Sequence, residues 1–158
     1  DVDSTAIVDG FTITGGGPEF LADGGGMANK NSNPRVENCT FQNNIAFFGG
    51  AMSNVSSSPR IENCTFQGNE ALSGGALENF QSDVKIINCQ FFDNSAGSGG
   101  AMRNRKSNGI TVRNSIFAGN KASNRGGGVY NITSSATKLK IDVTVIVLRV
   151  ISVSVLWW

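Results

Sequence analysis

The sequence predicts an all-β solenoid, a parallel β-helix in which each turn of the chain stacks on the one before it. Three observations carry this prediction. A glycine doublet recurs at nearly constant intervals, a block with a phenylalanine recurs at the same intervals, and the segments between them are rich in Gly, Asn and Ser. Residues of these types are poor helix formers and common in turns, so the repeat favours short strands joined by tight corners over a helical hairpin.

The glycine doublet is followed by a small residue and an apolar one, as in Gly-Gly-Ala-Met at residues 49–52. Successive copies are 25, 25, 25 and 27 residues apart, and an asparagine stands two residues after each apolar position. The doublets, each marking one rung, begin at Gly24, Gly49, Gly74, Gly99 and Gly126. The asparagines are Asn29, Asn54, Asn79, Asn104 and Asn131. We expect glycines to permit positive φ, and asparagines at the corners to bond through their amides to those above and below.

The second repeated block reads Val-Glu-Asn-Cys-Thr-Phe at residues 36–41, and a degenerate earlier copy occupies residues 8–13. Its phenylalanines are Phe41, Phe66, Phe91 and Phe117. Three residues after each comes an asparagine: Asn44, Asn69, Asn94 or Asn120. Equivalent residues of stacked rungs lie above one another, so these rings are expected to stack inside the coil.

One rung is expected to contain three strands of about 3 to 5 residues and three corners, which together use about 25 residues. Successive rungs then stack about 4.8 Å apart with their strands parallel and in register. The copies predict five to six rungs, in a repeat domain that covers residues 1–137.

Residues 138–158 form an atypical tail, because residues 139–158 contain neither glycine nor asparagine. One interpretation is a capping strand pair, which solenoids need at their ends. The other is a reading-frame shift: shifted codons from Val143 onward permit Asn, Gly, Asn, Ser and Ala, in phase with earlier rungs. Trp157 and Trp158 would then have no evolved function. The exposed, β-prone tail could join copies edge to edge, and the fragment is otherwise expected to be monomeric.

Composition excludes several functional classes. The formal charge of +1, from 13 basic and 12 acidic residues, argues against a nucleic-acid partner. The chain has no histidine, which removes Ser-His-Asp and Cys-His catalysis and His-ligated zinc. No stretch has the length and apolar composition of a transmembrane helix.

The cysteines Cys39, Cys64 and Cys89 form one column, with Ser115 in the next rung. On adjacent rungs their Cα atoms would be about 4.8 Å apart, which is within disulfide range by distance alone. Three is an odd number and the position accepts serine, so buried free thiols are favoured over one disulfide. A metal site is disfavoured, because three thiolates in a line give poor tetrahedral geometry.

The alternation of Gly-Gly-Ala-aliphatic with Phe-x-x-Asn resembles the paired signature of the chlamydial polymorphic outer-membrane protein repeat. One such pair is residues 49–52 with residues 66–69, and the resemblance covers about residues 6 to 131. That family belongs with the right-handed parallel β-helix repeat proteins of bacterial cell surfaces. The resemblance implies a right-handed coil and a secreted or surface-displayed (outer-membrane) passenger of an autotransporter, used as an adhesin or a stalk.

Right-handed β-helices also resemble, in overall fold, pectate lyases and polygalacturonases, which work with clustered carboxylates and a basic residue. The best catalytic candidates here are Glu37 and Glu62 on neighbouring rungs, each two residues after a basic residue. Those basic residues are Arg35 and Arg60, with Lys85 in the third rung. The two carboxylates could act as an acid–base pair or bind Ca²⁺, the one cofactor suggested. The alternative is an ion-pair column on a solvated face. The remaining carboxylates considered, scattered one per rung, are Glu78, Asp83 and Asp93.

The basic residues concentrate in the last complete rung. They are Arg103, Arg105, Lys106, Arg113, Lys121 and Arg125. Such a run is either a solvated rim or a dock for an anionic glycan. The leading functional prediction is a non-catalytic extracellular or surface module that binds a glycan or a protein. Uninterrupted rungs support it, since a catalytic β-helix usually carries long corner insertions, and the one insertion here is two residues long. The rival is a fragment of a polysaccharide lyase or hydrolase whose active site lies on other rungs.

Overall fold

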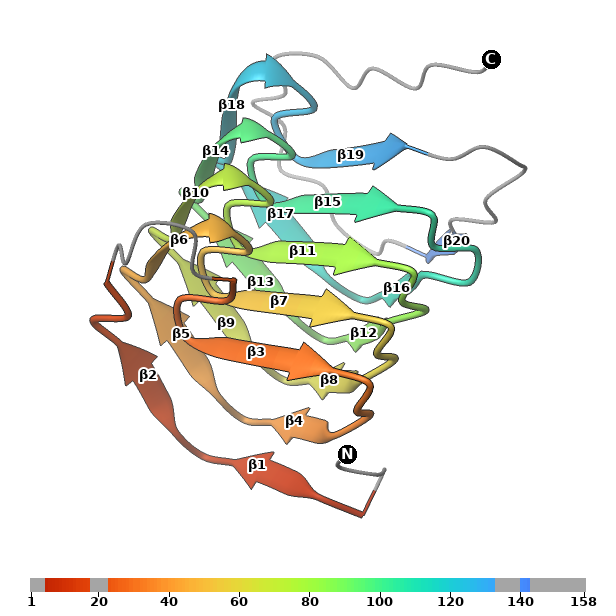
Figure 1. Ribbon diagram of the computed structural model, residues 1–158. Helices are drawn as coiled ribbons and strands as arrows, with labels where there is room; N and C mark the ends of the chain where they lie inside the picture. The colour runs from red at the N-terminus through yellow and green to blue at the C-terminus, as the bar shows by residue number, and fades with distance from the viewer. Residues whose placement is uncertain (1–4, 18–22, 133–139, 143–158) are drawn as a thin grey trace.

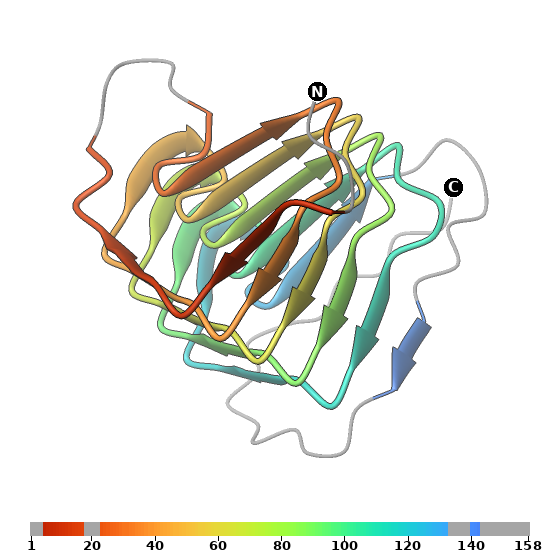
Figure 2. The ribbon, with the colours of Figure 1, turned by 90° about the horizontal axis from the view of Figure 1, so that it is seen from below.

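The computed structural model describes residues 5–17, 23–132 and 140–142, and every strand pairing within them is parallel. The chain winds as a right-handed coil that rises from β1 (Ile7–Asp9) to β19 (Val129–Ile132) in Figure 1. Seen from below in Figure 2, four sheets surround a single interior. The predicted right-handed parallel β-helix is confirmed, with about five turns of roughly 25 residues each.

Two of the four sheets are made of three-residue strands. Sheet A contains β1, β4 (Arg35–Glu37), β8 (Arg60–Glu62), β12 (Lys85–Ile87), β16 (Thr111–Arg113) and β20 (Lys140–Asp142). Sheet B contains β2 (Thr12–Thr14), β5 (Thr40–Gln42), β9 (Thr65–Gln67), β13 (Gln90–Phe92) and β17 (Ile116–Ala118).

The other two sheets have strands of four or five residues. Sheet C contains β6 (Ile45–Phe48), β10 (Glu70–Ser73), β14 (Ser95–Ser98) and β18 (Lys121–Arg125). Sheet D contains β3 (Met27–Lys30), β7 (Met52–Val55), β11 (Leu77–Phe80), β15 (Met102–Arg105) and β19. Strands pair with their equivalents in the next rung, so that Asn54 lies opposite Asn79.

A complete rung therefore has four strands, and the expectation of three was wrong. Asn38 has a φ of 53° and divides the predicted run at residues 36–41 into β4 and β5. Asn43, also with a φ of 53°, turns the chain again before β6. Asparagine tolerates this left-handed conformation better than most residues, so two residues between strands suffice for a corner. A corner that short leaves no break in the hydrophobic pattern, which explains the error.

The glycine doublet makes the corner between sheets C and D, and its two members have different roles. Gly49 has a φ of 62°, which costs a residue with a side chain more than it costs glycine. A Cβ atom on Gly50 would lie 2.3 Å from the carbonyl oxygen of Gly75 in the next rung. The first glycine is thus needed for its conformation and the second for close approach between rungs.

The phenylalanine block forms a ladder inside the coil, as predicted. Phe41, Phe66 and Phe91 are fully buried, and the ring centroids in the ladder are 5.1, 4.7 and 4.5 Å apart. Interplanar angles of 8°, 5° and 6° make all three contacts, including the last to Phe117, parallel stacks. Phe66 and Phe91 therefore pack between their equivalents in the rungs above and below, and Phe41 and Phe117 end the ladder.

Two further ladders consist of buried asparagines. In sheet D, the Nδ2 of Asn54 donates to the Oδ1 of Asn79 over 2.8 Å, and the same bond joins each pair from Asn29 to Asn131. These five residues lie within strands, so their expected place at the corners was wrong. At the corner between sheets B and C, the Nδ2 of Asn69 donates to the Oδ1 of Asn94 over 2.9 Å. Buried amides in both columns are thus hydrogen-bonded from rung to rung.

The solenoid register continues into the segment that was expected to be atypical. Strand β20 pairs with β16 in sheet A and places Ile141 opposite Val112. Residues 143–158, on which the capping and frame-shift interpretations depend, lie outside the described residues.

Candidate functional site

Sheet A carries on its outer face the acidic and basic residues that the sequence analysis proposed as catalytic. Strands β4 and β8 pair in register and place Glu37 beside Glu62, one rung apart. Each carboxylate has an ion-pair partner two residues earlier in its own strand. The pairs are Arg35–Glu37 and Arg60–Glu62. The two candidate residues are brought together, but each negative charge is compensated within its own rung.

This column ends in the third rung, where Ile87 lies opposite Glu62 and Lys85 opposite Arg60. Three or more Cys, Asp or Glu side chains with the geometry to hold a metal ion are not found together in the part of the chain that the structure describes. The arrangement on sheet A is that of a column of ion pairs.

A second charged region, which the sequence analysis left among the scattered carboxylates, lies on sheet D around Glu78. Along β11, Leu77 and Asn79 are fully buried in the interior. Successive side chains of a strand point to opposite faces, so Glu78 and Phe80 lie on the outer face. The register places Arg103 beside Glu78 and Arg105 beside Phe80 in the next rung.

The outward column that contains Glu78 is the clearest signal that sequence reasoning missed. Its members, in order of rung, are Ala28, Ser53, Glu78, Arg103 and Tyr130. The side chain at this position differs in every rung. The next residue of each strand, which points inward, is asparagine in all five rungs. In a solenoid, a position that varies while its neighbours repeat is not needed for stacking and is open to another role.

Although it lies on the outer face, Glu78 is only 2% exposed. The glycine corners lie close to the backbone of this column. A Cβ atom on Gly99 would lie 2.9 Å from the Cβ of Arg103, and one on Gly126 would lie 2.8 Å from the Cβ of Tyr130. The corners between sheets C and D therefore lie against the base of these outward side chains.

The buried carboxylate of Glu78 lacks a hydrogen-bond partner on either oxygen, among the described residues. Its nearest cation is Arg103, whose Nη1 lies 3.6 Å from Oε1, beyond hydrogen-bond distance. Burial raises the pKa of Glu78 to about 7, Asp23 adds to this effect, and the positive charges of Arg103 and Arg105 oppose it. The group is thus a buried acid that is incompletely compensated at neutral pH.

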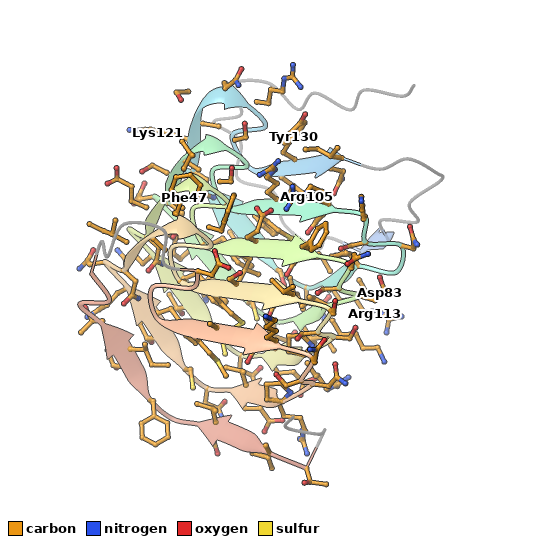
Figure 3. All side chains as sticks on the ribbon, in the orientation of Figure 1. Phe47, Asp83, Arg105, Arg113, Lys121 and Tyr130 are labelled. Atoms are coloured by element: carbon orange, nitrogen blue, oxygen red, sulfur yellow. The ribbon has the colours of Figure 1, made fainter. Side chains whose placement is uncertain are left out.

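The cations around Glu78 are held by aromatic rings. The guanidinium of Arg105 lies 4.4 Å from the ring centroid of Phe80, and the Nζ of Lys106 lies 5.7 Å from it. In the next rung, the Nη1 of Arg125 donates a hydrogen bond of 2.9 Å to the hydroxyl of Tyr130. Figure 3 shows Arg105 and Tyr130 over sheet D. We call this set the sheet D face: Glu78, Phe80, Arg103, Arg105, Lys106, Arg125 and Tyr130.

The predicted basic run is divided by the fold. Arg103 and Arg105 lie in β15 and Lys106 directly follows it, whereas Arg113 lies on sheet A. Lys121 and Arg125 are the two ends of β18 in sheet C, and Arg125 joins the sheet D face through its bond to Tyr130. Figure 3 shows Arg113 and Asp83 toward the corner between sheets D and A, and Lys121 on the opposite side. Asp83 accepts hydrogen bonds from the backbone N–H groups of Asn108 and Gly109.

The cysteines are buried free thiols in one column. The Sγ of Cys64 donates to the carbonyl oxygen of Glu62 over 3.1 Å, and the Oγ of Ser115 makes the equivalent bond to Arg113 over 2.8 Å. Serine therefore replaces cysteine here without loss of a hydrogen bond. Burial raises the pKa of the Cys39 thiol, which makes it a weak nucleophile at neutral pH.

Comparison with known proteins identifies one family. The model described as right handed beta helix region matches residues 2–145. Neither a curated protein nor a solved structure matches the chain. Among the described residues, none forms a helix long and apolar enough to cross a membrane.

Proposed function

Since the chain belongs to the right-handed β-helix family, we propose that it is a non-catalytic repeat module that binds a glycan or protein ligand through an outer face of the coil. The observation that carries this proposal is the sheet D face. It gathers four cations and a buried acid at positions that the stacking of rungs does not require. Charged side chains at positions that do not contribute to stacking indicate that the face binds a ligand.

The regularity of the rungs supports a binding module over an enzyme. Strands in each sheet have the same length apart from β18, which is one residue longer, and between Gly99 and Gly126 the register adds one residue before β16 and one within β18. The first rung is three residues longer than the next. The outer faces are therefore long and even, which suits an extended ligand. A catalytic cleft on a β-helix is usually bordered by long insertions at the corners of the rungs.

The repeat signature supports a location at the cell surface for this module. Its likeness to the chlamydial outer-membrane protein repeats favours display at a bacterial surface, as an adhesin or as a stalk in an autotransported passenger. The pairing of Gly-Gly-Ala-aliphatic with Phe-x-x-Asn supports this, because the four-strand rung uses both motifs at fixed corners.

A second function has one observation in its favour. Glu37 and Glu62 lie one rung apart in register, an arrangement that suits a divalent cation or an acid–base pair. This would make the chain part of a calcium-dependent enzyme acting on a uronic-acid polymer. Its ion pairs to Arg35 and Arg60 argue against it, because a ligand must displace them.

The two functions are separated by measuring binding and turnover on the same preparation. We expect the chain to be retained on arrays of glycans or surface proteins, with no release of unsaturated or reducing sugar ends from a uronic-acid polymer in Ca²⁺. Turnover that is lost in E37Q or E62Q would reverse this assignment. Absence of binding to every glycan and protein offered would refute the binding module.

A further inference from the structure

We propose that the sheet D face binds an anionic polysaccharide through Arg103 and Arg105, and that the buried Glu78 carboxylate competes with this ligand for Arg103. The proposal rests on the binding function above and adds to it a location, a ligand class and a means of control. Three features of the face support it: the lack of an ion pair to Arg105 and Lys106, the placement of the cations on two neighbouring rungs, and the position of Glu78.

The cations of this face are only partly compensated by carboxylates. In the parts of the chain that the structure describes, Arg103 pairs with Glu78 at 3.6 Å, and no ion pair joins Arg105 or Lys106 to an acid. The Nε atoms of Arg103 and Arg105 are buried and lack hydrogen-bond partners among these residues. Guanidinium groups bind sulfate and carboxylate through pairs of parallel hydrogen bonds, so two neighbouring arginines favour an anion of this shape.

The charges also extend over two consecutive rungs. Arg103, Arg105 and Lys106 lie in or directly after β15, and Arg125 bonds to Tyr130 in the next rung. Rungs repeat about every 4.8 Å, so the charge of Arg125 is offset along the coil axis from the other three. A polymer with a negative group on successive sugars can engage several of them at once, and each extra contact adds affinity. A small isolated anion gains nothing from this arrangement.

The ring of Phe80 restricts the cations that lie against it. The guanidinium of Arg105 is 4.4 Å from the ring centroid, a contact that uses its positive charge and none of its N–H donors. A long side chain held in this way loses less rotational freedom on binding than a solvated arginine does. The face is therefore arranged before a ligand arrives.

Glu78 provides control by pH. The charged groups that face it are Arg103 and Arg105 from β15 and Asp23 from the segment before β3. Arg125 and Tyr130, from β18 and β19, bond to one another. An anion bound to Arg103 removes the attraction that partly offsets the burial of Glu78, so the bound state favours the protonated acid. Ligand binding is then coupled to proton uptake, and affinity is expected to rise as the pH falls from 8 to 6.

The test measures binding of the whole chain to four polymers at pH 6 and pH 8: dextran sulfate, hyaluronan, uncharged dextran and a short DNA duplex. We expect binding to one or both charged polysaccharides and none to uncharged dextran. R105Q/K106Q should weaken it by about tenfold or more. E78Q should bind several-fold more tightly at pH 8 and lose the pH dependence, because it removes the competing charge.

R113Q/K121Q provides a matched control, since it removes two cations of the same run from sheets A and C. It should bind within about twofold of the wild type, because its changes leave the face intact. Thermal unfolding of each variant checks that the coil is folded.

The proposal is overturned if the control loses as much affinity as R105Q/K106Q, if R105Q/K106Q binds normally, or if DNA binds as tightly as the polysaccharides. Binding of neutral glycans or proteins without binding of polyanions would refute this inference and leave the proposed function standing.

Discussion

Sheets A and D both carry glutamate and arginine on their outer faces, but they arrange them differently. On sheet A, each carboxylate is paired with an arginine of its own strand, and the pair recurs in the next rung. On sheet D, Glu78 stands above a serine and below an arginine, and none of its oxygens is hydrogen-bonded within the described residues. A charge column in which each rung carries its own opposite charge is compensated within every rung. A charge that appears once needs another partner, and this distinguishes a structural face from a candidate binding face.

The largest expected effect comes from breaking the ladder beneath the sheet D face. Asn79→Ala removes its hydrogen bonds to Asn54 and Asn104 and leaves both of these buried amides with an unused group. Each unsatisfied buried group costs about 1–3 kcal/mol, so the free energy of unfolding should fall by about 4 kcal/mol. Urea denaturation followed by circular dichroism measures the change.

The matched substitution lies at the exposed asparagine corner next to sheet A. Asn63 has a φ of 53°, and Asn63→Gly keeps that conformation while removing two exposed amide contacts, to Asn38 and from Asn88. Its cost should stay below about 1 kcal/mol. Equal losses from both substitutions would show that burial does not distinguish the two ladders.

A large effect with a definite pH dependence is expected from Glu78→Gln. Since burial raises the pKa of Glu78 to about 7 from 4.5, the native state binds this proton more tightly than the unfolded chain does. Stability from this group is fully present below pH 4.5 and is lost as the pH rises through 7. Above pH 7 the free energy of unfolding has fallen by about 3 kcal/mol. Glu78→Gln avoids this loss, because the glutamine amide carries no charge.

The variant should therefore match the wild type near pH 4 and exceed its free energy of unfolding by up to about 3 kcal/mol at pH 8. Denaturation curves at both pH values measure this difference. Glu62→Gln is the control on sheet A, where loss of the half-exposed ion pair to Arg60 should cost no more than about 1 kcal/mol. A Glu78→Gln variant without any gain at pH 8 would mean that this carboxylate is compensated in solution.

The contrast between the faces also explains what the sequence could predict. Repetition predicts every feature that depends on stacking, so the period, the parallel register and the Phe41–Phe117 ladder followed from the spacing. The number of strands per rung did not, because the corner at Asn38 is only two residues long, with Asn38 in a left-handed conformation. Glu78 was missed for a related reason. Its importance arises from its burial and its unpaired oxygens, which no pattern of charges in the sequence reveals.

The smallest effect is expected in the cysteine column, which repeats like the ion pairs of sheet A but changes to serine at its end. Cys64→Ser should lower the free energy of unfolding by only about 1 kcal/mol, because the hydroxyl can donate to the carbonyl oxygen of Glu62 as Ser115 donates to Arg113. Cys64→Val is the control: it is similarly apolar but cannot donate, and its branched side chain must fit between Cys39 and Cys89. It should cost more than serine does, which urea denaturation of the two variants under reducing conditions would measure. If valine proved the milder change, the column would be held by packing alone, and the presence of Ser115 in the next rung would need another explanation.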